Sequence, residues 1–210
     1  MNRGIFICFE GVEGSGKSTQ IKHLHHYFSN KGLHVLSSRE PGGTSIGNKI
    51  RDLVLHEAEP IEPLTEVLLM MAARAQHVRH VLIPAIKTHD LIMSDRYADS
   101  SLIYQGFGRG LPIDQINYLN GLATQNIEPR LTFLLDHDPK KTFERIKNRR
   151  TFSTDRFEQE TLAFHEKIRT AYLNHAQNMK NKYCIIDAGL EETKITNILI
   201  QKVNELFESK

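Results

Sequence analysis

Residues 11–18 combine glycines, a lysine and a hydroxyl at a spacing that suits phosphate binding. The stretch reads Gly11-Val-Glu-Gly-Ser-Gly-Lys17-Ser18 and fits the pattern G-x-x-x-x-G-K-[ST], directly after the apolar run Ile5–Phe9. Its glycines allow a tight turn whose N–H groups point inward, and the helix predicted from about Lys17 adds positive charge at its N-terminus. In such a loop Lys17 reaches the β and γ phosphates and the Ser18 hydroxyl binds Mg²⁺.

The rest of the sequence excludes two common classes of phosphoryl-transfer protein. A GTPase needs N-K-x-D, but Asn48-Lys49 is followed by Ile-Arg, and Asn181-Lys182 is followed by Tyr-Cys. A protein kinase needs H-R-D and D-F-G, and neither occurs. We therefore expect a small kinase of a phosphorylated metabolite. The residues expected to bind ATP form one contiguous segment: Gly11, Val12, Glu13, Gly14, Ser15, Gly16, Lys17, Ser18 and Thr19.

Four arginines are candidates for contact with the acceptor's phosphate. Arg39 and Arg96 follow apolar runs, and Arg51 and Arg74 fall on predicted helices that could flank the same cleft. Arginine suits bidentate contact with phosphate, and Arg74, on an otherwise apolar helical face, needs a partner if that face is buried. An acceptor phosphate is already largely anionic at neutral pH, so positioning and charge neutralisation suffice without a side-chain base.

Short apolar runs separated by segments of helical spacing predict a doubly wound α/β fold. Runs without polar alternation are typical of parallel strands that are covered on both faces. In such sheets ligands bind beyond the carboxyl ends of the strands. The expected strands are Ile5–Phe9, Leu33–Leu36, Leu91–Met93, Leu131–Leu135 and Tyr183–Ile186.

The predicted helices leave one basic stretch without periodicity. The longest helix is expected from about Pro63 to His89, with a kink at Pro84. Further helices are expected at about Pro139–Asn148, Asp155–Met179 and Glu191–Glu208. Between them, residues 148–156 are the candidate for a lid that is mobile without ligands. We expect residues 1–210 to form a single domain that includes this lid.

Composition narrows the class of protein further. The chain has 210 residues, and 27 Lys and Arg against 25 Asp and Glu give a net charge of +2, too little for a surface devoted to nucleic acid. The longest apolar run, Val67–Ala73, is far shorter than the ~18 residues that cross a bilayer. Cys8 and Cys184 lie in apolar runs and are expected to be reduced. We expect a cytoplasmic protein that binds neither nucleic acid nor membrane.

Several motifs follow one another in an order that is shared with one family. They are Phe9-Glu-Gly-Val-Glu-Gly-Ser-Gly-Lys-Ser-Thr19, Arg39-Glu-Pro-Gly-Gly-Thr44, Ala73-Arg-Ala-Gln-His77, Asp95-Arg-Tyr97, Ser100-Ser-Leu-Ile-Tyr-Gln-Gly106 and Asp155-Arg-Phe-Glu158. Together they resemble bacterial thymidylate kinase, within the P-loop nucleoside monophosphate kinase superfamily, over essentially the whole chain. The resemblance implies a P-loop NTPase fold of three α/β/α layers, a five-stranded parallel sheet with a short lid, and a homodimer.

The resemblance also implies a reaction and a set of site residues. The reaction transfers the γ-phosphoryl group of ATP to dTMP, giving dTDP and ADP, with Mg²⁺ near Ser18 and Asp95. Lys17 and Arg96 are the expected catalytic residues of the loop and the cleft. The expected acceptor contacts are Arg51 and Arg96 with the phosphate, Arg74 with the thymine edge, Glu13 near the 3′-hydroxyl and Tyr104 beside the 2′ position, and Ser101 and Gln105 supply further contacts that are not assigned to one part of the acceptor.

Two features bear on the resemblance: the location of the arginines indicates a subgroup of the family, and Met70 departs from the family pattern. Some members have a catalytic arginine inside the loop, where this chain has Val12, Glu13, Gly14 and Ser15; Arg149 and Arg150 instead resemble the catalytic lid arginines of another subgroup. Met70 stands where the family has a phenylalanine that stacks on the base. A thioether binds a ring less strongly than an aromatic stack does. We expect weaker base binding, or compensation by another side chain such as Phe107.

Two other functions remain open on the sequence alone. One is a related small kinase for another nucleotide or a deoxynucleoside, and Met70 is the main reason to keep it. The other is a nucleotide-binding switch that transfers nothing. Asp95, Arg96 and the lid arginines disfavour the switch, because a protein that only binds nucleotide does not need to neutralise transition-state charge.

Overall fold

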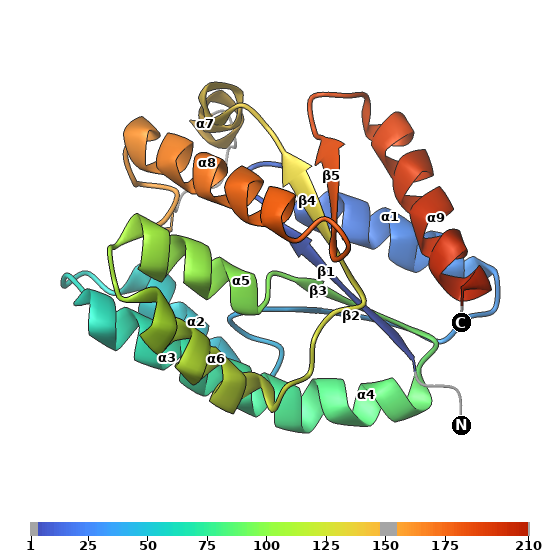
Figure 1. Ribbon diagram of the computed structural model, residues 1–210, viewed down its shortest axis with the longest axis horizontal. Helices are drawn as coiled ribbons and strands as arrows, with labels where there is room; N and C mark the ends of the chain where they lie inside the picture. The colour runs from blue at the N-terminus through green and yellow to red at the C-terminus, as the bar shows by residue number, and fades with distance from the viewer. Residues whose placement is uncertain (1–3, 148–154, 210) are drawn as a thin grey trace.

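A computed structural model describes residues 4–147 and 155–209. Within these ranges, five strands form one parallel sheet in the order β2-β3-β1-β4-β5 (Figure 1). All five predicted strands are present, but β2 begins at Val35 rather than Leu33, and each strand continues past its predicted end. The strands are β1 (Ile5–Glu10), β2 (Val35–Arg39), β3 (Leu91–Asp95), β4 (Leu131–Asp136) and β5 (Tyr183–Asp187).

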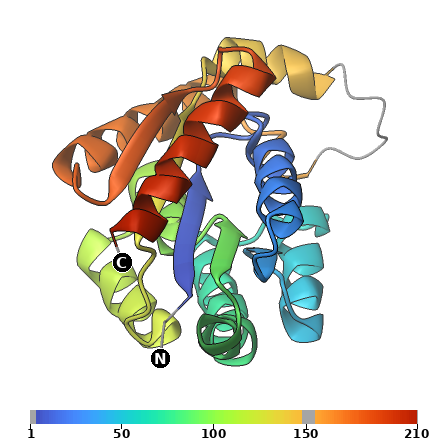
Figure 2. The ribbon, with the colours of Figure 1, turned by 90° about the vertical axis from the view of Figure 1, so that its right-hand side faces the viewer.

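Helices cover both faces of this sheet because successive side chains of a strand point to opposite faces. The odd-numbered residues of β1 pack with α1 (Lys17–Asn30) and α9 (Glu192–Glu208). Phe6 and Cys8 pack on the other face, where α4 (Ile83–Thr88) lies. Figure 2 shows helices on both sides of the strands, so the predicted three-layer α/β/α fold is confirmed.

The long predicted helix is present, and it contains a π-helical turn shortly before Pro84; the kink expected at Pro84 stays a prediction. The helix consists of α3 (Pro63–His77), the π-helical turn η1 (Val78–Leu82) and α4. Pro84 has no N–H to donate, and its ring would collide with the carbonyl four residues earlier in a regular α-helix. A wider π turn just before Pro84 accommodates the proline without ending the helix.

The helix predicted from Asp155 begins later than expected. The Asp155 carboxylate accepts hydrogen bonds from the backbone N–H groups of Phe157 (3.0 Å) and Glu158 (2.9 Å), which forms a turn instead of a first helical turn. Thr161 then caps α8 (Leu162–Asn178) by accepting from the N–H of Phe164 at 3.2 Å. The sequence motif at Asp155–Glu158 is therefore a loop, and Asp155 is free to face the site.

Further helices complete the layers around the site. No helix within the described ranges is long and apolar enough to cross a membrane. Both cysteines are free, as expected. The additional helices are α2 (Ser45–His56), α5 (Ala98–Ser101), the π-helical η2 (Leu102–Gly108), α6 (Ile113–Thr124) and α7 (Pro139–Lys147).

Candidate active site

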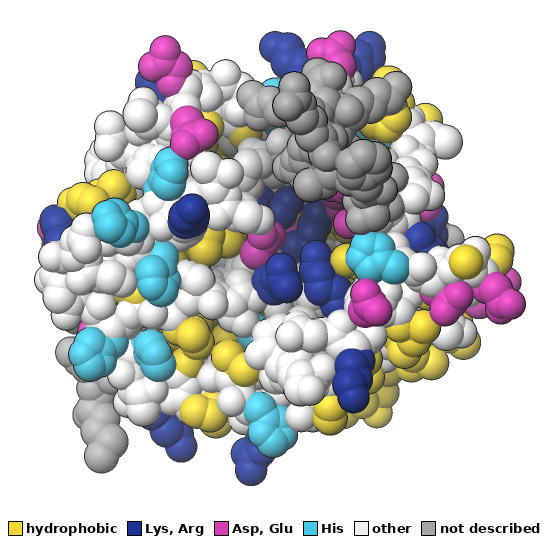
Figure 3. All heavy atoms as spheres, turned by 180° about the vertical axis from the view of Figure 1, so that it is seen from behind, with side chains coloured by type: hydrophobic (Ala, Val, Ile, Leu, Met, Phe, Trp, Pro, Cys, Tyr) yellow, Lys and Arg dark blue, Asp and Glu magenta, His cyan; other side chains and the backbone are white. Residues whose placement is uncertain are grey.

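The residues expected to bind the acceptor and the metal surround one cavity of about 260 Å³. It lies beyond the carboxyl ends of β1 and β3, and Figure 3 shows Lys and Arg side chains gathered in a hollow of the surface. The lining includes all four candidate arginines, Arg39, Arg51, Arg74 and Arg96. It also includes Glu13, Lys17, Ser18, Met70, Asp95, Ser101, Tyr104 and Gln105.

Only part of the phosphate-binding loop faces this cavity. Gly11 has φ +139°, and a Cβ atom there would lie 2.5 Å from the Leu135 carbonyl oxygen, so this position requires glycine. Val12 is buried in the core and Ser15 is buried within the loop. The expected ATP residues that line the cavity are Glu13, Gly14, Gly16, Lys17, Ser18 and Thr19.

Lys17 is held inside the loop by backbone carbonyls. Its Nζ donates to the oxygens of Gly11 (2.9 Å) and Val12 (3.0 Å). Burial and the nearby Arg96 guanidinium lower the pKa of Lys17 to about 8, although Asp95 opposes this shift. The side chain is therefore largely protonated at neutral pH and loses its charge only above it, and anionic phosphates favour the charged form.

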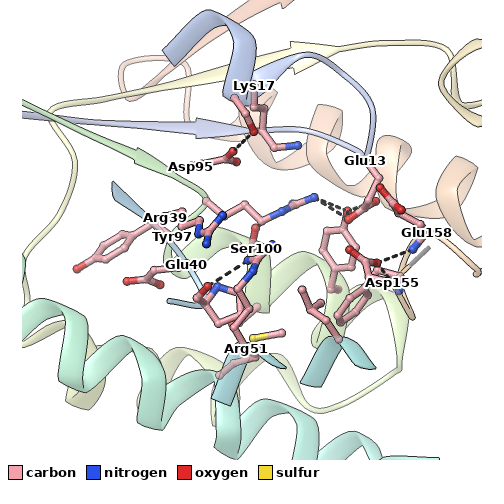
Figure 4. A pocket seen from close by; sticks show the side chains of 18 of the residues that line it. Glu13, Lys17, Arg39, Glu40, Arg51, Asp95, Tyr97, Ser100, Asp155 and Glu158 are labelled. Atoms are coloured by element: carbon pink, nitrogen blue, oxygen red, sulfur yellow. Dashed lines mark hydrogen bonds and ion pairs between the residues drawn. The ribbon is translucent and has the colours of Figure 1, made fainter. Parts of the chain in front are cut away.

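Ser18 and Asp95 bring a hydroxyl and a carboxylate together at the end of the loop. Ser18 Oγ donates to Asp95 Oδ2 at 2.6 Å, and both residues line the cavity. Both side chains offer oxygen atoms as metal ligands, and oxygen is the ligand type that Mg²⁺ prefers. Mg²⁺ is commonly held by one or two protein ligands together with substrate phosphates and water. The pair therefore fits a hard divalent cation that arrives with a polyphosphate. Figure 4 shows Lys17 and Asp95 at one end of the cavity and Arg51 at the other.

Arg96 reaches the cavity from a strained backbone position. Its φ of 70° is left-handed, and the conformation is fixed by its own N–H donating to the Phe9 oxygen (2.9 Å) and by Ser94 Oγ donating to its carbonyl (2.7 Å). The guanidinium donates to Glu13 Oε1 at 2.7 Å and to the Tyr104 hydroxyl at 3.2 Å. The strained backbone conformation of Arg96 thus directs its side chain into the cavity.

The Glu13 carboxylate is kept ionised by its neighbours. Burial alone would raise the pKa of Glu13, but the Arg96 guanidinium, a hydrogen bond from His165 and the charge of Lys17 together hold it well below the usual range. The Tyr104 hydroxyl also donates to both carboxylate oxygens, at 2.8 and 2.7 Å. Burial raises the pKa of Tyr104, so it remains a phenol that can donate these bonds.

Arg74 is buried, and its partners lie inside the protein. Its Nε donates to Glu40 at 2.7 Å, and its Nη1 donates to Ser101 (3.0 Å) and Asn120 (2.7 Å). Its Nη2 donates to the Tyr97 carbonyl at 2.8 Å. The buried arginine that needed a partner thus has several, and the contact with the base edge that the resemblance implies stays a prediction.

Met70 lines the cavity, and its place beside the base stays a prediction from the resemblance. Phe107, the side chain considered as compensation, is 45% exposed and does not line the cavity. Phe157 does line it, is 6% exposed, and packs edge-on against Tyr104 with ring centroids 5.5 Å apart. The expectation for Phe107 is therefore wrong, because that side chain points toward solvent from η2.

The two remaining candidate arginines lie at the rim. Arg51 Nη1 donates to the Pro41 carbonyl at 3.1 Å, which leaves most of its guanidinium for a ligand. Burial and the neighbouring Arg39 lower the pKa of Arg51, yet an arginine remains charged in this range. Like charges held together in this way attract an anion strongly.

Sequence reasoning missed several buried acids that support the site. Glu10 accepts from Tyr172 (2.6 Å) and Ser100 (2.7 Å), and burial raises its pKa although Arg96 opposes that rise. Glu40 joins Arg74 to His77, whose Nδ1 lies 2.8 Å from Glu40. A signal for such residues was present: Glu10 ends an otherwise apolar strand, and a charge in that position has to be paired.

Part of the expected site lies outside the described residues. Arg149, Arg150 and most of the lid at 148–156 fall in the range 148–154, which the structure does not describe. Arg156, at the end of that stretch, is described. Its guanidinium donates to the Val54 carbonyl (3.0 Å) and to Glu66 (3.2 Å).

Comparisons with known proteins agree with this geometry. The thymidylate kinase family profile matches residues 9–198. The chain is 43% identical to thymidylate kinase of Geotalea daltonii, covering 96% of this chain and 99% of the relative, and 42% identical to that of Lactobacillus delbrueckii subsp. bulgaricus, covering 98% of each. Its fold matches the crystal structure of thymidylate kinase from Ehrlichia chaffeensis with a TM-score of 0.77 and 28% identity, covering 96% and 99% of the two chains. The chain belongs to the thymidylate kinase family, whose members phosphorylate dTMP to dTDP with ATP.

Proposed function

We propose that this chain transfers the γ-phosphoryl group of ATP to dTMP and releases dTDP and ADP. One observation carries the proposal: the phosphate-binding loop and the arginines expected to hold the acceptor's phosphate line the same cavity. Donor and acceptor phosphates bound there meet in one enclosed space. Family membership supplies the identity of the acceptor.

The side chains divide the work of bringing two anions together. Lys17 contacts the β and γ phosphates, while Arg96 and Arg51 hold the acceptor's phosphate and offset its charge. The acceptor phosphate is itself the nucleophile, so these residues position it and no side chain has to remove a proton. The metal in this proposal is Mg²⁺, which Ser18 and Asp95 would hold. When bound, it would neutralise further charge on the phosphates. Charge neutralisation by Arg149 and Arg150 stays a prediction.

A panel of acceptors tests this proposal. ADP formation is measured with ATP and Mg²⁺ in the presence of dTMP, dUMP, dCMP, dGMP, dAMP or thymidine, and without any acceptor. We expect dTMP to give the highest kcat/KM. A better rate with another nucleotide or with thymidine favours the related kinase, and no turnover with any acceptor favours the nucleotide-binding switch.

We further propose that two copies of the chain associate through α2, α3 and α6. These helices pack side by side, with α3 in the middle, and carry large apolar side chains that are exposed in the single chain. Replacing one of them with lysine is expected to reduce the mass in solution from twice 24.1 kDa to the single-chain value. The exposed side chains are Ile46 (53%), Leu53 (42%), Leu64 (55%), Leu68 (48%), Tyr118 (69%) and Leu122 (61%).

We also propose that the protein works in the cytoplasm. Cys8 is buried and Cys184 is half-buried, and both are free thiols. Free cysteines without a disulfide partner are typical of proteins in reducing compartments. Detection of the protein in the cytoplasmic fraction of its cell would test this assignment.

A further inference from the structure

Glu66 is a buried carboxylate that contacts the cavity wall without lining the cavity itself. It lies on the buried side of α3 and is 0% exposed. Its Oε1 accepts from Gln105 Nε2 at 2.9 Å, and Arg109 Nε lies 3.6 Å from the same oxygen. Its Oε2 accepts from Arg156 at 3.2 Å. One acid thus joins α3, η2 and the loop before α8.

This contact fixes which end of the Gln105 amide faces the cavity. A carboxylate paired with two guanidinium groups can only accept hydrogen bonds, so Gln105 must present its NH₂ group to Glu66. Gln105 is 1% exposed and lines the cavity, and within the described ranges nothing donates to its Oε1. Glu66 therefore leaves Gln105 with a hydrogen-bond acceptor to offer a ligand.

Arg74, which also lines the cavity, offers the opposite polarity. A guanidinium carries five N–H groups. Those of Arg74 go to Glu40, Ser101, Asn120, the Met71 sulfur and the Tyr97 carbonyl, and one hydrogen on Nη2 has no acceptor among the residues described. The wall thus presents one donor, from Arg74, and one acceptor, from Gln105.

This pair is complementary to a pyrimidine edge with a carbonyl beside a ring N–H, which is the O4/N3 edge of thymine. Cytosine presents the reverse order, an amino donor beside a bare ring nitrogen. We propose that Glu66 is a positioning residue that sets the polarity of Gln105 and thereby makes the site select keto pyrimidines over amino pyrimidines. The inference rests on the proposed function, with dTMP as the acceptor in this cavity, and adds that its base lies against Arg74 and Gln105.

The variant Glu66→Gln tests the role of the carboxylate. A glutamine at 66 can present either its oxygen or its NH₂, so the amide of Gln105 is no longer held in one orientation. We expect the ratio of kcat/KM for dTMP to that for dCMP to fall at least about tenfold. This ratio does not depend on how much of the variant is folded, and an unchanged ratio overturns the inference.

The exchange Glu66→Gln with Gln105→Glu supplies the rescue. The amide at 66 then donates to a carboxylate at 105, whose second oxygen faces the base as an acceptor. We expect the selectivity to return to within about threefold of the unaltered enzyme. A double variant that is no more selective than Glu66→Gln contradicts the inference.

A control variant and a modified acceptor separate this inference from the proposed function. Glu160 is another partner of Arg109, 2.6 Å away, and Glu160→Gln removes its charge without touching Gln105. This variant should leave the ratio of kcat/KM for dTMP to that for dCMP unchanged. A tenfold fall of the ratio in Glu160→Gln would mean that the role of Glu66 is only structural. The unaltered enzyme should discriminate against N3-methyl-dTMP, which lacks the ring N–H. Equal use of that compound overturns the base-edge assignment and the inference with it. Discrimination against it, with an unchanged ratio in Glu66→Gln, overturns only the role of Glu66.

Discussion

The guanidinium of Arg96 and the carboxylate of Glu13 lie 2.7 Å apart, although 83 positions separate them in the chain. The contact ties the end of β3 to the phosphate-binding loop after β1. It orients Arg96 across the cavity and keeps Glu13 ionised. In the proposed function, an acceptor phosphate bound here would meet a cation that is already oriented, so little reorganisation would remain for the reaction.

Replacement of Arg96 by lysine should mainly weaken transfer to dTMP. Lysine keeps the charge but cannot contact Glu13 and a phosphate through a planar fork. We expect kcat/KM for dTMP to fall about 100-fold, or ~2.7 kcal/mol, with the KM for ATP changed less than about threefold. Arg79→Lys, at an exposed arginine of η1, is the matched control. A loss of under about threefold in Arg96→Lys would contradict the assigned role.

Removal of the Ser18 hydroxyl should raise the requirement for Mg²⁺. Ser18 lies 2.6 Å from Asp95, and both oxygens are assigned to the metal. In Ser18→Ala we expect the free Mg²⁺ concentration for half-maximal rate to rise at least about tenfold at saturating ATP. Ser18→Thr keeps the hydroxyl and should behave like the unaltered enzyme. The same Mg²⁺ dependence in Ser18→Ala would place the metal elsewhere.

ATP binding should take up a proton above neutral pH. The pKa of Lys17 is lowered to about 8 in the free protein, so the side chain is largely neutral at higher pH. Bound phosphates favour the charged form, so the affinity for ATP should weaken as pH rises through 8, by up to about tenfold per pH unit. Calorimetry at pH 8.5 in buffers of different ionisation enthalpy measures the uptake. Lys17→Arg should show none, because arginine does not titrate in this range.

Met70→Phe should strengthen the binding of dTMP. Met70 lines the cavity and is 9% exposed, in the position where the family has a stacking phenylalanine. Aromatic stacking is worth roughly 1–3 kcal/mol per base, more than a thioether gives. We expect the KM for dTMP to fall about threefold or more, while the KM for ATP serves as the internal control. An unchanged or raised KM for dTMP would argue against a stacking role.

Gly43→Ala should destabilise the protein because Gly43 packs closely against the side chains of Ser38 and His77. Its φ is +74°, and a Cβ atom would lie 2.6 Å from His77 Cδ2 and 2.7 Å from Ser38 Oγ. We expect urea unfolding to show a loss of about 2–4 kcal/mol in the free energy of unfolding. Gly121→Ala is the matched control: it lies within α6, and apart from its chain neighbours and the nearby backbone of that helix no atom lies within 4 Å of the added methyl, so it should gain about 0.5–1 kcal/mol. Equal effects of the two substitutions would contradict this account.

The sequence was most informative where a local pattern has one physical solution. Buried parallel strands must be apolar on both faces, so their positions could be read directly. The loop at 11–18 has a spacing that serves phosphate binding, and it lies where expected. The turn at Asp155 could not be read in this way, because helical spacing continues through it and only the capping bonds of Asp155 and Thr161 move the start of α8.

The supporting acids could not be predicted because their partners are distant in the chain. Glu66 meets Gln105 across 39 positions and Arg156 across 90. Glu40 meets Arg74 across 34 positions. Local periodicity shows that such a charge falls on a buried face, but the packing of three or more elements decides which partner satisfies it.

Transfer of label from ATP tests the central claim most directly. The protein is mixed with γ-³²P-labelled ATP, Mg²⁺ and an equimolar mixture of dTMP, dCMP, dGMP and dAMP, and the nucleotide products are separated. We expect the label to appear in dTDP in proportion to the ADP formed, with dTDP the main labelled diphosphate. Label found mainly in another nucleotide, or only in inorganic phosphate, would contradict the account.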